Sequence, residues 1–305
     1  MEFLQQCVIG LVQGSIYALI ALGYTMVYGV LRFINFAHGD IYMLGAYFGY
    51  FAAGRLGTSE RLREGGSAGF GEVALVLAIA MIGSALVGVL IERIAYRPLR
   101  NAPRLTALIT AIGVSMLIEY GAQSLFSPNP QSFPKLIPET PLISSGDFQI
   151  TLLQVVIIAV AIALMAALQF FIFGTKIGRA MRAVALDRPA AQLMGINTDV
   201  VIFWTFAIGS ALAAAAGVLN SAYQNTITPL IGISVGLKAF VAAVLGGIGN
   251  IPGAVLGGLV LGFAETAVSA TDYSAYRDAI AFAILIVVLL VRPSGILGKT
   301  TAEKV

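Results

Sequence analysis

The sequence predicts an all-α membrane protein: a polytopic bundle of about eight or nine transmembrane helices that forms one domain over residues 1–305. Three observations lead to this fold class. Hydrophobic residues make up 58% of the chain, charged residues make up only 11%, and the mean hydropathy is +0.91. A soluble domain carries about 25% charged residues. This chain therefore lacks the polar groups that would cover a folded surface in water.

Runs without charged residues predict the spans. They cover 3–31, 41–54, 73–91, 105–118 (continuing past Glu119), 148–175, 200–237, 239–264 and 279–291. At about 1.5 Å per residue, most of these runs are long enough to cross the hydrocarbon core. The first run has no positively charged segment before it, so we expect it to stay in the mature protein as a helix.

Lysine and arginine in the short connections predict the orientation, because cytoplasmic loops carry an excess of these residues. The basic connections contain Arg93, Arg97, Arg100 and Arg104, then Lys176, Arg179, Arg182 and Arg188, and finally Arg292, Lys299 and Lys304. We expect these segments to be cytoplasmic. The loop 127–149 holds five prolines and one lysine, which predicts an extended extracytoplasmic cover. The loop 55–72 is balanced in charge, and alternation places it outside. The N-terminus is then outside and the C-terminus inside.

The region 235–271 allows two interpretations of the helix count. A run of glycines, Gly246-Gly247-Ile248-Gly249-Asn250-Ile251-Pro252-Gly253, interrupts an otherwise apolar stretch. Two crossings here give nine spans with a short seventh, which we favour. One long crossing gives eight and conflicts with the charge rule at one end. Non-helical backbone at membrane depth lies against protein or a cavity, so Gly246, Gly247, Gly249 and Asn250 are candidates for the transport path.

The segment Ile34-Asn35-Phe36-Ala37-His38-Gly39-Asp40 is the most polar one at the start of a predicted span. Ionisable groups within spans are costly and usually face protein or a water-filled path, so Asn35, His38 and Asp40 are candidates to line or gate a path. Two structural alternatives are open: Asn35 caps the helix that begins here, and His38 lies near the lipid head groups. No catalytic residue is assigned, because a triad would need a nucleophile that the sequence does not place.

Three further ionisable residues fall within or at the ends of spans. Glu119 lies about fourteen residues into its run and is a path candidate, with a paired structural role equally open. For Lys238 and Glu265 we expect structural pairing. Glycines spaced four apart, such as Gly10 with Gly14 and Gly258 with Gly262, predict a tightly packed bundle.

The stretch 178–196 predicts a short helix-turn-helix outside the membrane. Pro189 suits the first turn of a second helix, and Gly195 suits its end. The residues that we expect to dock into a partner are Met181, Val184, Leu186, Leu193 and Met194. The alternative is an amphipathic helix that rests on membrane lipid.

The segment Gly298-Lys299-Thr300 lies after the last predicted span. It lacks the first glycine and the preceding strand of a nucleotide-binding loop, so we expect no ATP site in this chain.

The composition also excludes several kinds of site. One cysteine, Cys7, and one histidine, His38, cannot form an internal disulfide or a metal site with several histidine or thiolate ligands. We therefore expect neither a metal nor a cofactor in this chain. The net charge of +3 is small for 305 residues, and the basic residues lie in short loops, so nucleic-acid binding is not expected.

Four motifs in order resemble the LivH-type permeases of bacterial branched-chain amino acid ABC importers. These motifs are the 34–40 segment, the 178–199 loop, the stretch 238–258 with its Leu245-Gly246-Gly247-Ile248-Gly249 core, and the end Arg292-Pro293-Ser294-Gly295-Ile296-Leu297-Gly298. The resemblance covers nearly the whole chain. It implies a permease domain in the bacterial inner membrane with a fold like that of type II ABC importers.

The resemblance also implies partners and a coupling element. The partners are a second, LivM-like permease, two cytoplasmic ATPases that bind ATP and Mg, and a periplasmic amino-acid-binding protein. The loop 176–199 would contact the ATPases through Gly178, Arg179, Arg182, Ala183, Asp187, Ala191 and Gly195. The implied cargo is leucine, isoleucine or valine. Urea and amide permeases share a similar Asn-x-Ala-His-Gly segment and are the alternative within this class. An ion-coupled secondary transporter is the alternative outside it.

Overall fold

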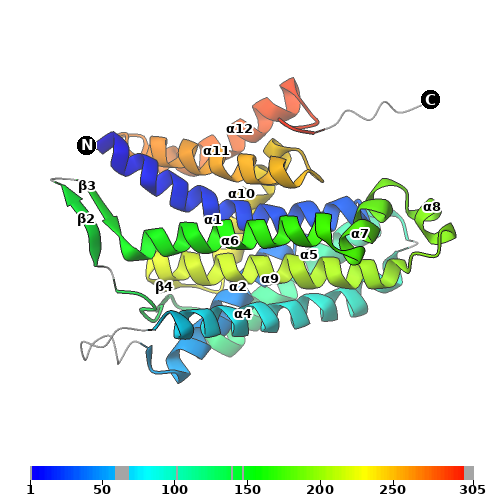
Figure 1. The fold of residues 1–305 in the computed structure, drawn as a ribbon, viewed down its shortest axis with the longest axis horizontal. Helices are drawn as coiled ribbons and strands as arrows, with labels where there is room; N and C mark the ends of the chain where they lie inside the picture. Colours follow the sequence, from blue (N-terminus) through cyan, green and yellow to red (C-terminus); the bar gives the residue numbers. More distant parts are fainter. Residues whose placement is uncertain (1, 59–68, 101, 139, 146–147, 299–305) are drawn as a thin grey trace.

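The computed structural model describes residues 2–58, 69–100, 102–138, 140–145 and 148–298 as an elongated helical bundle (Figure 1). The helices are α1 (Glu2–Leu31), α2 (His38–Arg55), α4 (Phe70–Ile91), η1 (Glu92–Tyr96), η2 (Arg97–Leu99), α5 (Arg104–Phe126), α6 (Leu152–Gly174), α7 (Lys176–Leu186), α8 (Arg188–Leu193), α9 (Thr198–Gln224), α10 (Ile231–Gly246), α11 (Ile251–Ser269), η3 (Ser274–Tyr276) and α12 (Arg277–Val291). Four short strands complete the described chain: β1 (Gln131–Ser132), β2 (Pro141–Ser145), β3 (Phe148–Thr151) and β4 (Thr226–Ile227).

Seven helical segments in the described chain are long and apolar enough to cross a membrane. They are α1, α4 with its continuation to Leu99, α5, α6, α9, α11, and α12 with η3. The prediction of a polytopic helical bundle is confirmed. Two further helices belong to the predicted set of nine: α10 is apolar but has only 16 residues, and α2 has 18 residues but begins with His38 and Asp40. Their passage through the bilayer stays a prediction.

Two predicted span boundaries were wrong, because composition does not always show where a helix breaks. The run 200–237 contains α9, a left-handed residue at Asn225 (φ 54°), β4 and the first part of α10. The predicted break near 246–253 is confirmed, because α10 ends at Gly246 and α11 begins at Ile251. The run 148–175 begins with the strand β3, and α6 starts only at Leu152, where Thr151 and Gln154 form a reciprocal capping box.

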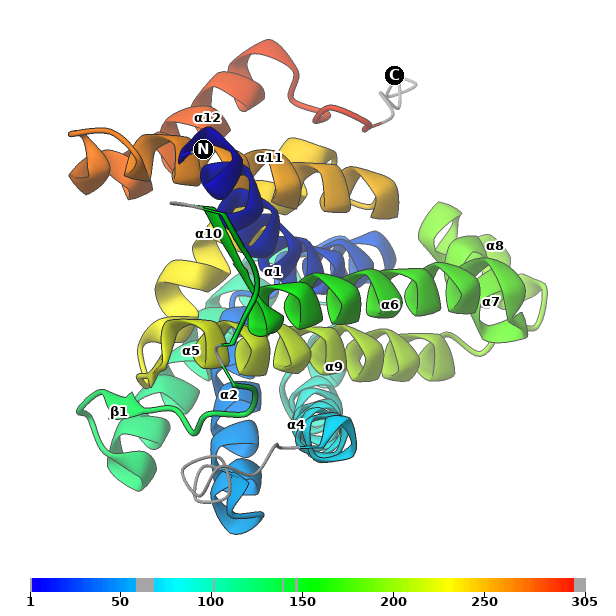
Figure 2. The ribbon, with the colours of Figure 1, turned by 60° about the vertical axis from the view of Figure 1, so that its left-hand side comes forward.

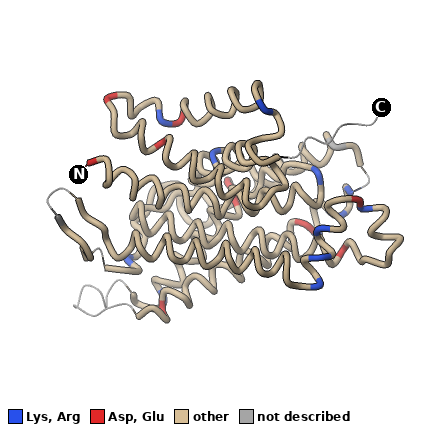
Figure 3. The backbone as a smooth tube through the Cα atoms, turned by 45° about the horizontal axis from the view of Figure 1, so that its top comes forward, with Lys and Arg blue, Asp and Glu red and all other residues tan. Residues whose placement is uncertain are grey.

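The predicted extended character of loop 127–149 is confirmed for its described part. Strands β2 and β3 form an antiparallel hairpin, and β1 pairs antiparallel with β4. The hairpin lies at the same end of the bundle as the N-terminus, and α7 and α8 lie at the opposite end (Figures 1 and 2). Most lysines and arginines gather at the α7–α8 end (Figure 3). Loop 55–72 lies largely outside the described residues.

Helix α1 runs through the centre of the bundle and is buried along most of its length from Gly10 to Val27. Glycines allow its backbone to approach that of neighbouring helices. A Cβ atom at Gly262 of α11 would overlap the backbone of Gly14, and one at Gly258 would overlap Ala18. Such small-residue contacts stabilise helix pairs in lipid, where no hydrophobic force drives them together. The predicted glycine-mediated packing is therefore confirmed.

An ionic network centred on buried groups joins four helices. It confirms the prediction that Lys238 and Glu265 are paired for a structural role. The Lys238 Nζ atom lies 3.0 Å from Glu265 Oε1 and 2.7 Å from Asp278 Oδ1. The Tyr17 hydroxyl donates to Glu265 Oε2 at 2.7 Å. Lys238 and Glu265 are both buried. The network thereby connects α1, α10, α11 and α12 through charges that satisfy one another.

We expect Gly262→Ala to destabilise the protein, because the added methyl group overlaps the Gly14 backbone and forces α1 and α11 apart. Overpacking of this kind costs about 1–3 kcal/mol. The matched control is Gly113→Ala in α5, where no atom lies within 4 Å of the added carbon. Thermal unfolding of the purified protein in detergent should show a lower midpoint for Gly262→Ala only. Equal midpoints for both variants would contradict the close packing.

We expect Glu265→Ala to lower the free energy of unfolding by about 3–5 kcal/mol, because it leaves the buried Lys238 ammonium without its buried partner. The double variant Lys238→Met with Glu265→Gln removes both buried charges and should unfold close to the parent midpoint. The same thermal measurement tests both. A double variant as unstable as Glu265→Ala would show that the network does not stabilise through charge pairing.

Candidate functional site

The segment predicted to line a path lies in the loop between α1 and α2 and in the first turn of α2. Asn35, His38 and Asp40 are all buried there. The side chain of Asn35 does not cap α2, whose N-cap residue is Ala37. Instead, Asn35 Oδ1 accepts a hydrogen bond of 2.6 Å from the hydroxyl of Tyr96 in η1. The capping alternative for Asn35 was therefore wrong.

His38 lies inside the bundle, where its side chain is buried. Its ring packs edge-on against Tyr24 of α1, with 4.6 Å between the ring centroids. A Cβ atom at Gly23 would overlap the imidazole. Gly23 therefore makes room for His38 against α1. This contact anchors the start of α2 to the central helix.

Asp40 and Glu119 come together through Ser115. The Ser115 hydroxyl lies 2.5 Å from Asp40 Oδ2 and 3.4 Å from Glu119 Oε1. Asp40 is buried, whereas Ser115 and Glu119 on α5 are half-buried. Of the residues proposed for a path, Asp40 and Glu119 are the pair that the structure brings together, through one shared hydroxyl group. Sequence reasoning missed Ser115, although its spacing of four residues from Glu119 places both on one helix face.

The break between α10 and α11 is a turn held by the C-terminal part of the chain. Gly247 and Gly249 have φ values of 102° and 94°, which favour glycine. Asn250 caps α11 by accepting from the backbone N–H of Gly253 (3.3 Å), and its Nδ2 donates to the Leu297 carbonyl at 2.7 Å. A Cβ at Gly246 would overlap the Gly253 backbone. These contacts give a structural role to each of the four path candidates in this turn: Gly246, Gly247, Gly249 and Asn250. Ile248 in the same turn lines a small cavity together with Ile34 of the α1–α2 loop.

The predicted helix-turn-helix is present as α7 and α8, which protrude from the end of the bundle opposite the N-terminus (Figure 1). Thr175 and Asp187 cap the two helices: Thr175 Oγ1 accepts from the Gly178 N–H at 3.0 Å, and Asp187 Oδ1 from the Ala190 N–H at 2.9 Å. Gly195, with a φ of 82°, follows α8 and turns the chain. The caps fix the positions of both helices.

The apolar residues of this element divide into two groups. Met181 and Val184 are buried against the bundle, so their predicted role as docking residues was wrong. Leu186, Leu193 and Met194 are 85%, 89% and 83% exposed. Tertiary packing separates the two groups, because α7 places one side against the bundle. The exposed group is the surface available to a partner.

The polar residues of α7 and α8 divide in the same way. Arg182 points inward, where it donates to the Ile172 carbonyl and lies over the Phe173 ring at 4.8 Å. A Cβ at Gly178 would overlap the carbonyl oxygens of Phe171 and Ile172. Ala191 is buried and Ala183 is half-buried, whereas Arg179, Asp187 and Gly195 are exposed. The predicted set thus contains residues that hold the element and residues that face outward.

Arg32 connects this element to the path candidates and was missed by sequence reasoning. Its Nη2 atom donates to the Ala185 carbonyl of α7 at 2.6 Å. Arg32 directly follows α1 and has a φ of 60°, a conformation that non-glycine residues rarely adopt. The loop that it begins leads to Asn35 and Asp40. A displacement of α7 can therefore pull on the start of α2.

An arginine cluster at the same end ties α9 to the connection between α4 and α5. Arg100 pairs with both Glu92 and Asp199, and Arg97 Nη2 lies 2.6 Å from Asp199 Oδ2. Glu92 is buried although it is charged. The predicted basic connection is thus a folded unit with its own ion pairs.

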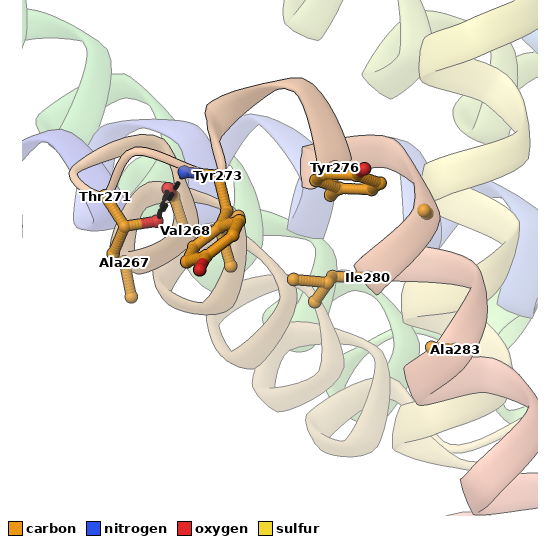
Figure 4. A pocket seen from close by; sticks show the side chains of 8 residues that line it. Ala267, Val268, Thr271, Tyr273, Tyr276, Ile280 and Ala283 are labelled. Atoms are coloured by element: carbon orange, nitrogen blue, oxygen red, sulfur yellow. Dashed lines mark hydrogen bonds between the residues drawn. The ribbon is translucent and has the colours of Figure 1, made fainter.

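One cavity near the end of α11 contains none of the predicted residues. It measures about 550 Å³ and lies between the end of α11 and the start of α12 (Figure 4). Its lining is Ala267, Val268, Thr271, Tyr273, Tyr276, Ala279, Ile280 and Ala283. Tyrosines at helix ends are typical of the membrane–water interface. The cavity lacks ionisable groups apart from its two tyrosines.

Within the described residues, no group of three or more histidine, cysteine, aspartate or glutamate side chains could hold a metal ion. The titratable groups of the site are the carboxyl pair at Ser115 and the arginine cluster. Both arrangements join helices that are far apart in the sequence.

Comparisons with known proteins place these features in context. Residues 6–289 match the family described as "Branched-chain amino acid transport system / permease component". The permease protein LivH of the high-affinity branched-chain amino acid transport system of Salmonella typhimurium is 46% identical over 99% of this chain and 98% of its own length. The corresponding permease protein BraD of Pseudomonas aeruginosa is 44% identical over 100% and 98%. The ribose import permease RbsC of Haemophilus influenzae is 34% identical over 37% of each chain.

We expect Ser115→Ala to destabilise the α2–α5 contact, because the buried Asp40 carboxyl loses its hydroxyl partner. A buried polar group left without a partner costs about 1–3 kcal/mol. The control is Ser124→Ala, an exposed position on the same helix. Thermal unfolding in detergent should show a fall in midpoint for Ser115→Ala alone. An equal effect at both positions would mean that Ser115 does not join the two helices.

Proposed function

The chain belongs to the family of branched-chain amino acid transport permeases, and on that premise we propose that it carries leucine, isoleucine or valine across the bacterial inner membrane as the permease of an ABC importer. The observation that carries this proposal is the family match over residues 6–289 in a bundle with seven apolar spans. The chain is a transport component and not an enzyme.

The energy for transport would come from partner subunits. We propose two cytoplasmic ATPases that bind ATP and Mg, a second permease similar to LivM, and a periplasmic amino-acid-binding protein. Relatives named as permease proteins of a transport system support such an assembly. The segment at Gly298 lacks the glycine spacing of a nucleotide-binding loop, which is consistent with ATP binding on other chains.

The ATPases would contact the exposed face of α7 and α8. The support is the cluster of Leu186, Leu193 and Met194, which is mostly open to solvent at a helical element that protrudes from the bundle. Large apolar side chains that pack into a partner's pocket carry much of the binding energy at protein interfaces. Arg179, Asp187 and Gly195 lie on the exposed part of the same element. The basic character of this end supports a cytoplasmic position and an N-terminus on the other side.

ATPase closure would act on the path through Arg32. When α7 moves, the bond from Arg32 to the Ala185 carbonyl transmits the displacement to the loop that holds Asn35 and to the first turn of α2. Asp40 in that turn then shifts against Ser115 and Glu119 of α5. We place the path along the α2–α5 contact, because Glu119 is half-buried there and an ionisable group within a span usually faces water or protein.

An apolar cargo fits the scarcity of charge inside the membrane. A branched aliphatic side chain needs contact with apolar surface, and one methylene discriminates by only about 1–3 kcal/mol. Selectivity among leucine, isoleucine and valine is therefore expected to be broad. The similarity of the whole chain to LivH and BraD favours this cargo over urea or short amides.

The proposal is tested by uptake of radiolabelled leucine into proteoliposomes that hold the complete complex with the ATPases and the binding protein. We expect ATP-dependent uptake that unlabelled isoleucine inhibits and urea does not. Inhibition by urea would favour the amide-importer alternative. Uptake by the single chain under an ion gradient, without ATPases, would overturn the ABC mechanism.

Leu193→Asp tests the docking surface in the same assay. A charge at the centre of an apolar contact should weaken ATPase binding and lower ATP-dependent uptake at least about tenfold, which corresponds to about 1.4 kcal/mol. Leu193→Met keeps an apolar side chain of similar size and should behave like the parent. Full uptake by Leu193→Asp would show that α8 does not contact the ATPase.

A further inference from the structure

A small cavity with three arginines lies at the α7–α8 end of the bundle. It has a volume of about 80 Å³. Arg32 from the α1–α2 loop, Arg100 after η2 and Arg188 from the start of α8 line it together with Glu92 and Tyr96. Residues far apart in the sequence thus bring three arginines to one partly open space, in which Arg32 is exposed and Arg100 and Arg188 are half-buried.

The positive charge of this cavity is only partly balanced. Arg100 pairs with Glu92 and Asp199. Among the ion pairs of the described residues, none includes Arg32 or Arg188. Arg32 instead donates to the neutral carbonyl of Ala185. Two guanidinium groups without a carboxylate therefore border the same cavity, and their repulsion is stronger in a partly buried site than in water. An anion between the two guanidinium groups would reduce this repulsion.

The other walls of the cavity are apolar. Leu31, Phe33, Leu99, Ala102 and Ala107 complete its lining. The cavity also lies where two candidate spans meet the membrane boundary, because one span ends at Leu99 and the next begins at Leu105. Basic pockets between spans at the cytoplasmic surface are suited to the head groups of anionic lipids. The chemistry of this site is thus an anionic group next to apolar surface.

We propose that this cavity binds the phosphate of an anionic phospholipid head group, and that Arg32 and Arg188 hold it. Its volume exceeds the roughly 30 Å³ that one water molecule occupies in the liquid, so it accommodates a group of a few heavy atoms and not a whole lipid. A guanidinium binds phosphate through two parallel N–H donors. The acyl chains would extend along the apolar residues toward the bilayer.

A phosphate in this position would join two parts of the proposed coupling mechanism. Arg188 belongs to the α7–α8 element, and Arg32 begins the loop that leads to Asp40. A head group held by both would fix α8 against the α1–α2 loop and make transport depend on anionic lipid. This dependence of transport rests on the proposed function, whereas lipid binding itself does not.

Lipid binding is measured by native mass spectrometry. The complete complex in detergent is titrated with phosphatidylglycerol or phosphatidylcholine, and the lipids that remain bound are counted after the detergent is removed in the instrument. We expect a phosphatidylglycerol molecule that binds at least about tenfold more tightly than phosphatidylcholine. Arg188→Gln should remove this preference, and Arg188→Lys, which keeps the charge but loses the two parallel donors, should retain only part of it. The control Arg93→Gln changes an exposed arginine at the same end that does not line the cavity. Equal lipid binding by Arg188→Gln and Arg93→Gln would overturn the site.

A second arm separates a lipid from a soluble anion. Inorganic phosphate at millimolar concentration is added to the complex, and displacement of phosphatidylglycerol is measured. We expect little displacement, because phosphate lacks the acyl chains that contact the apolar walls. Complete displacement would overturn the lipid assignment in favour of a free phosphate.

A third arm distinguishes failure of the inference from failure of the proposed function. Leucine uptake is compared in liposomes with and without phosphatidylglycerol. We expect leucine uptake by the parent to rise at least about threefold when phosphatidylglycerol is present. Uptake by Arg188→Gln should be the same with and without this lipid. Equal uptake by the parent in both membranes would overturn the lipid dependence and leave the transport function standing. A complex that binds the lipid as expected but moves no leucine would overturn the transport function alone.

Discussion

The rest of the structure depends on the close approach of α1 to the helices around it. Lipid provides no hydrophobic force between two apolar helices, so their association rests on close contact of the backbones and on internal polar bonds. Gly14 and Gly262 meet without side chains between them, and Gly23 leaves room for the ring of His38. Because α1 is held on several sides, its end is a defined point from which the 32–37 loop and α2 start.

Polar side chains then determine how the outer helices sit against this centre. Each of the main buried polar pairs joins different elements: Asn35 with Tyr96, Asp40 with Ser115, and Lys238 with Glu265. Inside a bilayer, a polar group without a partner is costly, so each pair strongly favours one register of its two helices. Two of these pairs, Asn35 with Tyr96 and Asp40 with Ser115, connect the α1–α2 loop and the first turn of α2 to η1 and α5.

Much of the fold could be predicted from the sequence, because charge-free runs and basic loops report directly on the bilayer. The run 3–31 corresponds closely to α1, and 73–91 to α4. The break after α9 was missed, since Asn225 differs from its surroundings in conformation and hardly in hydropathy. The break between α10 and α11 was predicted, because the glycines around Gly247 mark it in the sequence. The partners of the site residues were also missed. Tyr96 is 61 residues from Asn35, and nothing local in either segment indicates their contact.

The turn between α10 and α11 has a consequence for how the protein is made. The last carbonyl groups of α10 receive their hydrogen bonds from the end of the described chain: Ile296 N–H donates to Leu245 O at 2.8 Å and Leu297 N–H to Gly246 O at 3.1 Å. Synthesis proceeds from the N-terminus, so α10 and α11 enter the membrane before these donors have left the ribosome. Until then the end of α10 has unsatisfied carbonyls, which are costly in a bilayer. The α10–α11 hairpin therefore matures only after residues 296 and 297 have left the ribosome, and a ribosome stalled before that point would hold a permease whose central helix is in place but whose hairpin is not yet locked.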